Sequence, residues 1–445
     1  MRMQDLEAKI RKRQLRVGVI GLGYVGLPFA VEFAKAGVRT TGIDIDRERL
    51  DILRRGQSYI PDVPSQVVAS LVEGGVLEVT DDYATLHELD AAFICVPTPF
   101  TRAKTPDLSF VIAAAKALGK YLHSGQIIVI QSTTYPGTTE EVVLPILEAT
   151  GLRVGEDFFL AFSPERIDPG NRLYGPQNTP KVVGGIGPEA SALVATLFEL
   201  IVDRKQIHVV SSPKAAEMCK LLENTFRSVN IALVNELAKL CDRMGMDVWE
   251  VIDAAATKPF GFMPFYPGPG VGGHCIPVDP YYLSWKARES NFYTKFIELA
   301  AETNQSMPYY TVSKIIRALN AHGRPLQGSQ ILVLGTAFKR NVEDPRNSPS
   351  LEIMQLLHSY GARVFYNDPY IPKVEVESPR EPNRPFVYES RALTPELLQA
   401  MDCVLIAVHH AFYEISWIVE HSRLIVDAQN ATRGIRTEAG KVVRL

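Results

Sequence analysis

The amino-acid sequence predicts an α/β protein with two doubly wound parallel-sheet domains joined by a central helical region. Three observations predict this class. Short apolar strands alternate with helical patterns in the first half of the chain, the same succession returns after residue 330, and a long helical pattern separates the two. We therefore expect three regions, at residues 1–211, 212–323 and 324–445.

Length and composition agree with a globular protein of several domains. The chain has 445 residues, which is more than one hydrophobic core usually organises. Hydrophobic residues make up 46% and charged residues 22%, as in ordinary soluble proteins. The formal net charge of −3 gives no nucleic-acid footprint, but it leaves room for a local basic pocket that binds phosphates.

The N-terminus and the cysteines predict a cytoplasmic protein. No apolar run is long enough to cross a bilayer, and residues 1–14 lack the apolar core of a signal peptide. The five cysteines have neither CxxC nor zinc spacing. We therefore expect reduced thiols, no metal site and no membrane partner.

The first strand, over residues 15–21, runs into a glycine motif and then into a helix over residues 27–36. The motif has the spacing Gly-x-Gly-x-x-Gly, with Gly21, Gly23 and Gly26. Such a motif alone is a weak signal, because many loops contain several glycines.

The next strand, over residues 39–43, ends at Asp44 and strengthens that signal. Strand, glycine turn, helix, strand and acid in this order are the Rossmann fingerprint. The dinucleotide pyrophosphate is expected on the helix N-terminus and the adenosine ribose on Asp44. A carboxylate there disfavours a 2′-phosphate, so the predicted cofactor is NAD rather than NADP. The alternative is an α/β domain that binds no nucleotide.

Small hydroxyl residues and an acid follow further strands of the same predicted sheet. The strands are expected at residues 91–96, 126–131 and 158–162. Thr98, Thr133 and Glu165 come shortly after them, at the edge where open α/β sheets bind ligands. The threonines are equally compatible with ordinary loop or helix-cap roles.

A long helix is predicted over residues 213–245, with Ser212 as its N-cap. At this length it is expected to pack as a central or inter-subunit helix. Lys220 and Asn224 are four residues apart and therefore share one face. That face indicates either a site or a solvated polar stripe.

A glycine-rich loop over residues 267–282 places Cys275 behind four glycines and four residues before Asp279. Backbone N–H groups that turn inward in such a loop favour a thiolate or a developing oxyanion. The alternative is that Cys275 is a buried small hydrophobe and that Asp279 caps the next helix. Helical patterns continue from 281 to 322, and Pro308 predicts a break or kink there.

The last region echoes the first. The predicted strands at residues 330–335, 361–368 and 402–408 correspond to those at 15–21, 37–44 and 90–96. This second copy lacks the third glycine and carries Lys339, Arg340 and Arg346 in its first loop, where they suit the phosphates of another nucleotide or form a solvated basic loop. His409 and His410 have no accompanying metal ligands and are predicted to be structural.

Taken in order, these segments resemble the UDP-glucose/GDP-mannose dehydrogenase family over nearly the whole chain. The matching pieces are GLGYVGLP, VPTP, QSTTYPGT, SPERIDPG, KLLENTFRSVNIALVNE, GPGVGGHCIPVDP and LGTAFKRNVEDPRNSPS. Within the family, residues 258–262, residues 265–270 and His274 are most similar to members that oxidise UDP-N-acetylglucosamine. An arginine that many members carry upstream of the cysteine has no counterpart between Lys258 and Gly268.

The resemblance implies a four-electron oxidation of the C6 hydroxyl of a UDP-N-acetylhexosamine, most simply UDP-N-acetylglucosamine, to the uronic acid. Two NAD⁺ are consumed, and Cys275 forms a thiohemiacetal and then a thioester. The implied catalytic residues are Cys275, Lys220, Asn224, Asp279, Glu165 and Thr133.

The resemblance also implies two binding sets and an assembly. The cofactor set is Gly21, Gly23, Tyr24, Val25, Gly26, Asp44, Arg49, Val96, Thr98 and Thr133. The substrate set is Glu165, Arg166, Lys220, Asn224, Tyr266, Gly272, Lys339 and Arg346. A homodimer or higher homo-oligomer is expected.

Other functions remain open from the sequence. UDP-N-acetylmannosamine and UDP-glucose are alternative substrates. A two-electron hydroxyacid dehydrogenase of similar layout would need neither Cys275 nor a second nucleotide fold, and a non-catalytic NAD-binding protein would have no need to keep Cys275, Lys220 and Asn224 together.

Overall fold

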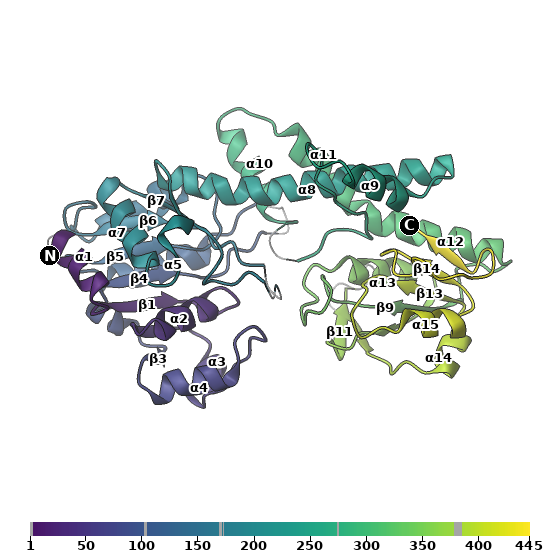
Figure 1. Ribbon diagram of the computed structural model, residues 1–445, viewed down its shortest axis with the longest axis horizontal. Coiled ribbons are helices and arrows are strands. Elements are labelled where there is room, and N and C mark those ends of the chain that lie inside the picture. Colours follow the sequence, from purple (N-terminus) through teal and green to yellow (C-terminus); the bar gives the residue numbers. More distant parts are fainter. Residues whose placement is uncertain (1–2, 102–104, 169–170, 172, 274–275, 378–384) are drawn as a thin grey trace. The chain divides into compact units, whose positions relative to one another are not determined.

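A computed structural model of the chain describes residues 3–101, 105–168, 171, 173–273, 276–377 and 385–445. The chain forms two compact units. Unit 1 contains residues 1–223 and 281–292, and unit 2 contains residues 224–280 and 293–445. Each unit is built around a parallel β-sheet (Figure 1).

The sheet of unit 1 has eight strands in the order β3-β2-β1-β4-β5-β6-β7-β8. Neighbouring strands are parallel except β6 and β7, which are antiparallel. The first six have the order of a dinucleotide-binding sheet, whose ligand crevice lies between β1 and β4. The strands are β1 (Arg16–Ile20), β2 (Arg39–Ile43), β3 (Leu77–Thr80), β4 (Ala91–Ile94), β5 (Ile127–Ile130), β6 (Phe159–Phe162), β7 (Lys181–Gly185) and β8 (Ile207–Val209).

Helices cover both faces of this sheet (Figure 1). One apolar cluster joins the sheet to α1, α2 and α7, and a second joins it to α5 and α6. Strands covered on both sides must be apolar throughout, and β4, β5 and β6 are fully buried. The helices are α1 (Met3–Arg11), α2 (Gly26–Lys35), α3 (Arg47–Arg54), α4 (Ser65–Glu73), α5 (Ser109–Gly119), α6 (Leu144–Glu148) and α7 (Pro188–Phe198). Helix α10 (Asp279–Glu289) begins in unit 2 and continues into unit 1.

The predicted long helix is α8 (Pro213–Met244), of 32 residues. Ser212 caps it as expected, because its hydroxyl oxygen accepts a hydrogen bond from the Ala215 N–H at 3.2 Å. Gly245, at φ 69°, ends the helix, and α9 (Val248–Ala256) starts after Asp247, whose carboxylate caps it. Residues 213–223 of α8 belong to unit 1, and residues 224–244 belong to unit 2.

The sheet of unit 2 has five parallel strands in the order β10-β9-β13-β14-β15, and a separate antiparallel pair, β11 and β12. Helices α12 and α13 share an apolar cluster with one face, and α14 and α15 share one with the other. The strands are β9 (Gln330–Leu334), β10 (Arg363–Asn367), β11 (Lys373–Val376), β12 (Phe386–Glu389), β13 (Cys403–Ile406), β14 (Ile425–Asp427) and β15 (Val442–Arg444). The helices are α11 (Lys295–Gln305), α12 (Met307–Ala321), α13 (Pro349–Ser359), α14 (Pro395–Ala400) and α15 (Ile415–His421).

The predicted fold class and internal repeat are confirmed. Strand β1 lies between β2 and β4, and β9 lies between β10 and β13 in the same way. The residue pairing between these strands has the same register in the two sheets. Gly335 and Asp368 therefore take the places of Gly21 and Asp44. Pro308 lies in the first turn of α12, so it marks a break between two helices rather than a kink within one.

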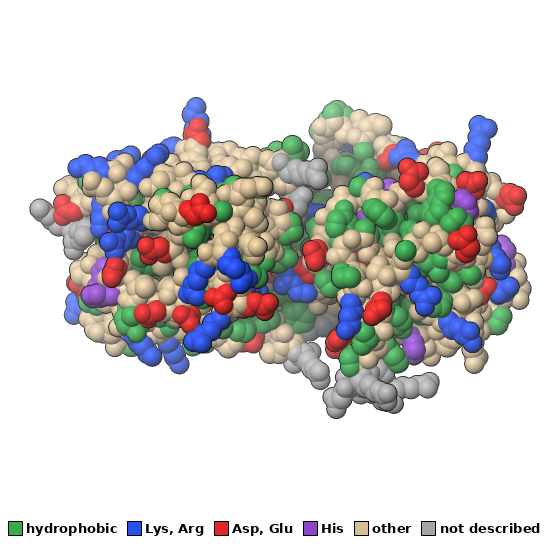
Figure 2. Space-filling model, turned by 90° about the horizontal axis from the view of Figure 1, so that it is seen from below, with side chains coloured by type: hydrophobic (Ala, Val, Ile, Leu, Met, Phe, Trp, Pro, Cys, Tyr) green, Lys and Arg blue, Asp and Glu red, His purple; other side chains and the backbone are tan. Residues whose placement is uncertain are grey.

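No helix in the described ranges is long and apolar enough to cross a membrane. On the face drawn in Figure 2, lysines and arginines alternate with carboxylates over each unit, so the described side chains of that face form no large patch of one charge.

Candidate active site

The glycine turn after β1 gives each of its glycines a different reason to be glycine. Gly21 has φ +90°, which side chains rarely adopt. A Cβ at Gly26 would lie 1.8 Å from the Gly21 carbonyl oxygen, so α2 could not pack this close to the turn. A Cβ at Gly23 would meet nothing within 4 Å. The space at Gly23 is where a dinucleotide pyrophosphate approaches the backbone in this fold.

Asp44, at the end of β2, is held in place by the backbone around it. Its carboxylate accepts hydrogen bonds from the Leu22 N–H at 2.6 Å and the Asp46 N–H at 3.0 Å. Arg49 lies 3.8 Å from Asp44 and 3.2 Å from Asp46. The carboxylate is 6% exposed and points to the same turn as the glycines.

The remaining predicted cofactor residues lie at the carboxyl ends of β1, β4 and β5. Tyr24 is exposed, whereas Val25, Val96, Thr98 and Thr133 are half-buried. Two further contacts fix these loops. The Ser132 hydroxyl donates to the Val96 carbonyl at 2.7 Å, and the Tyr282 hydroxyl donates to the Thr98 carbonyl at 2.6 Å.

Glu165 lies at the same edge of the sheet, after β6, and is 5% exposed. Its carboxylate accepts hydrogen bonds from the Arg166 N–H at 2.7 Å and the Ile167 N–H at 3.0 Å. The Lys181 ammonium, itself fully buried, donates to it at 3.0 Å, and the Gln131 amide donates at 3.3 Å. Glu165 is therefore a buried carboxylate whose charge is balanced from inside unit 1.

Lys181 and Gln131 were not predicted. Lys181 is the only charged residue of β7 and opens a strand that is buried at every position. A lysine at the start of such a strand implies a buried counter-charge. The sequence therefore indicated a buried counter-charge for Lys181, but it did not indicate that Glu165 supplies it.

Arg166 is tied to α8 within unit 1. Its guanidinium donates to Glu223 at 2.6 Å and to the Pro180 carbonyl at 3.0 Å. Lys220, on the same helix, is 6% exposed, and no carboxylate in the described part of unit 1 pairs with it. Burial raises the pKa of the Cys219 thiol, as does nearby Glu223, which favours the neutral thiol at this position.

Asn224 is brought together with Asp279 in unit 2. The Asn224 amide nitrogen donates to the Asp279 carboxylate, and its amide oxygen accepts from the Arg227 guanidinium. Asn224 is fully buried and Asp279 is 2% exposed. Asp279 is therefore held by α8 as well as by its own helix. Arg227 was missed, although it lies three residues after Asn224 on the same helix.

Cys275 and His274 lie outside the described residues. The glycines before them pack against the loop of residues 336–347, which we call the basic loop. The Gly273 N–H donates to the Arg346 carbonyl at 3.2 Å, and the Asn347 amide donates to the Gly273 carbonyl at 2.9 Å. A Cβ at Gly272 would lie 2.8 Å from Cβ of Phe338, so this contact requires a glycine.

Two predicted phosphate-binding cations lie on the basic loop. Lys339 is half-buried and Arg346 is exposed. The Arg346 guanidinium forms a two-pronged ion pair with Asp344, with Nε–Oδ1 at 2.9 Å and Nη2–Oδ2 at 2.6 Å. A bidentate pair holds the guanidinium in one orientation at the surface of unit 2.

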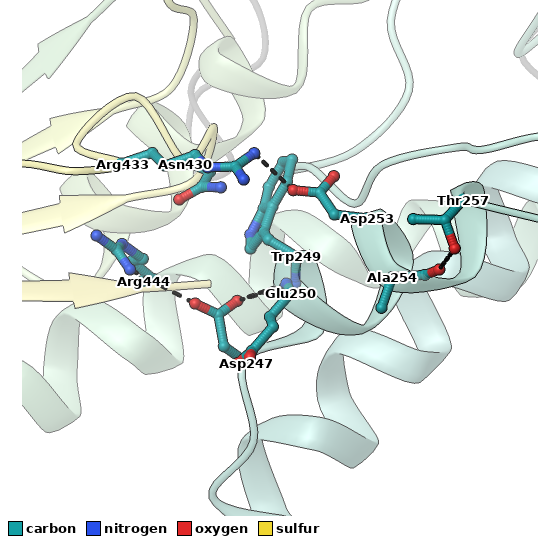
Figure 3. A pocket seen from close by; sticks show the side chains of 9 residues that line it. All are labelled: Asp247, Trp249, Glu250, Asp253, Ala254, Thr257, Asn430, Arg433 and Arg444. Carbon is teal, nitrogen blue, oxygen red and sulfur yellow. Dashed lines mark hydrogen bonds and ion pairs between the residues drawn. The ribbon is translucent and has the colours of Figure 1, made fainter.

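A pocket of about 380 Å³ lies in unit 2 (Figure 3). Tyr266 contacts two of its lining residues, Trp249 and Asp253. Its ring stacks on Trp249 at 5.3 Å, and its hydroxyl donates to Asp253 at 2.8 Å, which raises the pKa of Tyr266. Ion pairs of Arg433 with Asp253 and of Arg444 with Asp247 cross the pocket. None of the predicted site residues lines it. Within the described ranges, no three His, Cys, Asp or Glu side chains come together as metal ligands.

A glycine turn with room for a pyrophosphate, backed by a carboxylate at the ribose position, is the geometry of an NAD-dependent dehydrogenase, and the second sheet adds a second nucleotide fold. Comparison with protein families gives three matches in order. They are the NAD binding domain at residues 15–202, the central domain at 214–306 and the UDP binding domain at 332–434, all of one family. The chain belongs to the UDP-glucose/GDP-mannose dehydrogenase family and is an NAD-dependent nucleotide-sugar dehydrogenase.

Individual relatives are named as nucleotide-sugar dehydrogenases as well. UDP-N-acetyl-D-glucosamine 6-dehydrogenase of Pseudomonas aeruginosa is 41% identical over 81% of this chain and 84% of that protein. UDP-N-acetyl-D-mannosamine dehydrogenase of Escherichia coli K12 is 34% identical over 94% of this chain and 99% of that protein. The solved structure of UDP-D-ManNAc dehydrogenase from Pyrococcus horikoshii has a TM-score of 0.86 at 32% identity, covering 97% and 99% of the two chains.

The glycine turn yields a test with a matched pair of variants. Gly26→Ala should destabilise the protein by at least about 1–3 kcal/mol, because its Cβ would meet the Gly21 carbonyl oxygen. Gly23→Ala should change the stability of the free protein by less than about 0.5 kcal/mol, yet weaken NAD⁺ binding by filling the pyrophosphate space. Thermal unfolding and NAD⁺ titration measure the two effects. Equal loss of stability in both variants would contradict the assignment.

Proposed function

We propose that the protein oxidises the C6 hydroxyl of a UDP-N-acetylhexosamine, and most specifically UDP-N-acetylglucosamine, to the uronic acid. The observation that best supports this reaction is the hydrogen bond from Asn224 to Asp279. It joins a polar residue of α8 to the carboxylate that follows Cys275 by four residues. The choice of sugar is supported by the 41% identity to the Pseudomonas aeruginosa enzyme and by residues 258–270.

The proposed reaction converts a primary alcohol and water to a carboxylate in two oxidations. Bound NAD⁺ accepts one hydride in each oxidation. The Cys275 thiolate adds to the C6 aldehyde carbon, and after the second oxidation water cleaves the thioester and returns the thiol. Covalent capture prevents escape of the aldehyde.

Lys220 and Asn224 are proposed to stabilise the oxygen at C6. Lys220 is buried and has no carboxylate partner among the described residues of unit 1. A buried ammonium is costly unless negative charge balances it, and an oxyanion at C6 would supply that charge. Both residues project from one helix, so their spacing along α8 is constant.

Thr133, Glu165 and Asp279 are proposed to position water and to accept protons. Asp279 is suited to proton transfer because it lies near Cys275 in sequence and is held by Asn224. Glu165 is suited to orienting groups, since Lys181 and two backbone N–H groups already occupy its carboxylate.

Nucleotide binding is divided between the two folds in this proposal. NAD⁺ binds at Gly21, Gly23 and Gly26, with Asp44 on the adenosine ribose and Tyr24, Val25, Arg49, Val96 and Thr98 around it. The UDP part of the substrate binds at the basic loop of unit 2, through Lys339 and Arg346. Gly272, Tyr266 and Arg166 are the other members of the proposed substrate set. The expected regions 1–211, 212–323 and 324–445 would then serve NAD binding, catalysis with dimerisation, and UDP-sugar binding.

UDP-N-acetylmannosamine is the second candidate substrate. It is favoured by the Escherichia coli and Pyrococcus horikoshii relatives, which match over more of the chain than the Pseudomonas aeruginosa enzyme does, although at lower identity.

A substrate panel distinguishes these candidates. We expect the highest kcat/KM for UDP-N-acetylglucosamine, compared with its galacto and manno epimers, UDP-glucose and GDP-mannose, and with NAD⁺ preferred to NADP⁺. A site that hydrogen-bonds the acetamido group should reject UDP-glucose by about 10⁴, whereas a roomy pocket would discriminate only about 10 to 200-fold. Preference for UDP-glucose or GDP-mannose would refute the acetamido assignment. Preference for another epimer would correct only the stereochemistry.

The covalent mechanism has its own test. The wild-type enzyme should release two NADH for each sugar nucleotide consumed, and Cys275→Ala should form no uronic acid because it cannot form the thioester. Cys219→Ala serves as the control and should retain the two-to-one ratio. Uronic acid formation by Cys275→Ala near the wild-type rate would exclude a thioester.

We further propose a homodimer formed through α8. Five large apolar residues on this helix recur at heptad spacing and are 36–60% exposed, at Phe226, Leu233, Leu237, Leu240 and Met244. An apolar stripe of this length on a long helix needs a partner, and a second copy of the same helix supplies a complementary stripe.

The dimer prediction is tested by sedimentation. The wild-type protein should sediment as a dimer or larger at micromolar concentration, and Leu240→Asp should shift it toward monomer because a carboxylate would interrupt the stripe. Tyr360→Asp, at a similarly exposed residue at the end of α13 in unit 2, should leave the assembly unchanged. A monomeric wild-type protein would rule out the dimer.

A further inference from the structure

The ligand crevice of the second fold is closed by a side chain. In unit 1 the crevice lies between the loops that follow β1 and β4, and in unit 2 it lies between the loops that follow β9 and β13. Counted in the same register, His410 takes the place of Thr98, and Asp368 takes the place of Asp44. His410 Nε2 lies 3.1 Å from the Asp368 carboxylate, directly across the crevice.

Asp368 is committed to this internal contact. Its Oδ2 accepts hydrogen bonds from the Thr336 N–H at 2.7 Å and the Ala337 N–H at 3.0 Å, as well as from His410. Its Oδ1 accepts from the N–H groups of Tyr370 and Ile371. Burial alone would raise the pKa of Asp368, but the hydrogen bonds from His410 and the backbone hold it below its usual value. The ribose-binding acid of the first fold thus has a structural counterpart in the second.

His410 joins this carboxylate to the middle of the basic loop. The Asn341 N–H donates to His410 Nδ1 at 3.0 Å, so the ring proton is assigned to Nε2, which faces Asp368. Asn341 has φ 59°, and its side-chain amide oxygen accepts a hydrogen bond from the Ala411 N–H at 2.8 Å. The imidazole is fully buried and packs against the rings of Tyr370 and Tyr413.

The far end of the basic loop reaches the glycines before Cys275. Arg346 and Asn347 bind the backbone of Gly273, and the Phe338 side chain packs on Gly272 through its Cβ and on Gly273 through its ring. One loop therefore carries Lys339 and Arg346, rests on His410 at its middle and touches the cysteine loop at its end.

We propose that His410 is a positioning residue that, through Asp368 and Asn341, closes the nucleotide crevice of the second fold and holds the basic loop in the conformation that receives the UDP part of the substrate. This rests on the proposed function, in which Lys339 and Arg346 bind that diphosphate. Because His410 fills the crevice, the second fold binds the UDP at the basic loop rather than at Asp368, the counterpart of Asp44.

The experiment measures UDP binding by calorimetry, with no turnover required. His410→Phe keeps the ring volume and loses both hydrogen bonds, so UDP binding should weaken by about ten- to a hundredfold, as expected when binding groups shift by about 1 Å. The KM for the sugar nucleotide should rise by the same factor. The affinity for NAD⁺, which binds the other fold, should not change. His409→Phe, at the adjacent half-buried histidine, should retain wild-type UDP affinity.

A second variant separates positioning from stability. His410→Asn presents an amide oxygen near the place of Nδ1 and can still accept the Asn341 N–H, but it cannot reach Asp368. It should recover most of the UDP affinity lost in His410→Phe, even if both variants unfold at a lower temperature. Folded His410→Phe with wild-type UDP affinity would overturn the inference, as would equal loss in His410→Asn. A wild-type protein that binds no UDP would overturn the proposed function as well.

Discussion

In both folds of this protein, a carboxylate at the end of the second strand holds the loop at the end of the first. Asp44 accepts the Leu22 N–H, and Asp368 accepts those of Thr336 and Ala337. The constraint is geometric, because adjacent parallel strands end at the same edge and the turn between strand and helix leaves backbone donors without partners. The carboxylate satisfies those donors and so sets the shape of the crevice.

The two folds then diverge through a few residues around that carboxylate. In unit 1 the turn has a glycine with open space, Gly23, and Thr98 stands four residues after the end of β4, so the crevice can admit a dinucleotide. In unit 2 Ala337 is fully buried and His410 fills the equivalent space. The same topology thus provides one open crevice and one rigid support for a surface loop.

Buried charge is a second constraint on unit 1. Lys181 is fully buried against Glu165, and removing either partner would leave an uncompensated charge at a cost of about 3–5 kcal/mol. The pair lies under the carboxyl edge of the sheet, where the cofactor residues gather. The shape of this edge therefore depends on Lys181, which belongs to none of the predicted binding sets.

The sequence by itself determined the class of fold, the internal repeat and the long central helix. These follow from local signals, namely apolar strands, glycine turns and helix caps, and observed strand and helix ends differ from the predicted ones by only one or two residues at most positions. Through resemblance and helix spacing it also predicted Asn224 and Asp279 as site residues, and these two side chains are hydrogen-bonded to each other.

Only the tertiary structure decided which polar groups meet. Glu165 and Lys181 are joined across β6 and β7, and Asp368 and His410 across the second crevice, because strand order brings together residues that are far apart in the chain. The sequence predicted a structural role for His410 but neither the carboxylate that it contacts nor the loop residue that donates to it. Local patterns carry no information on such pairs, since partner choice depends on register and sheet order rather than on neighbouring residues.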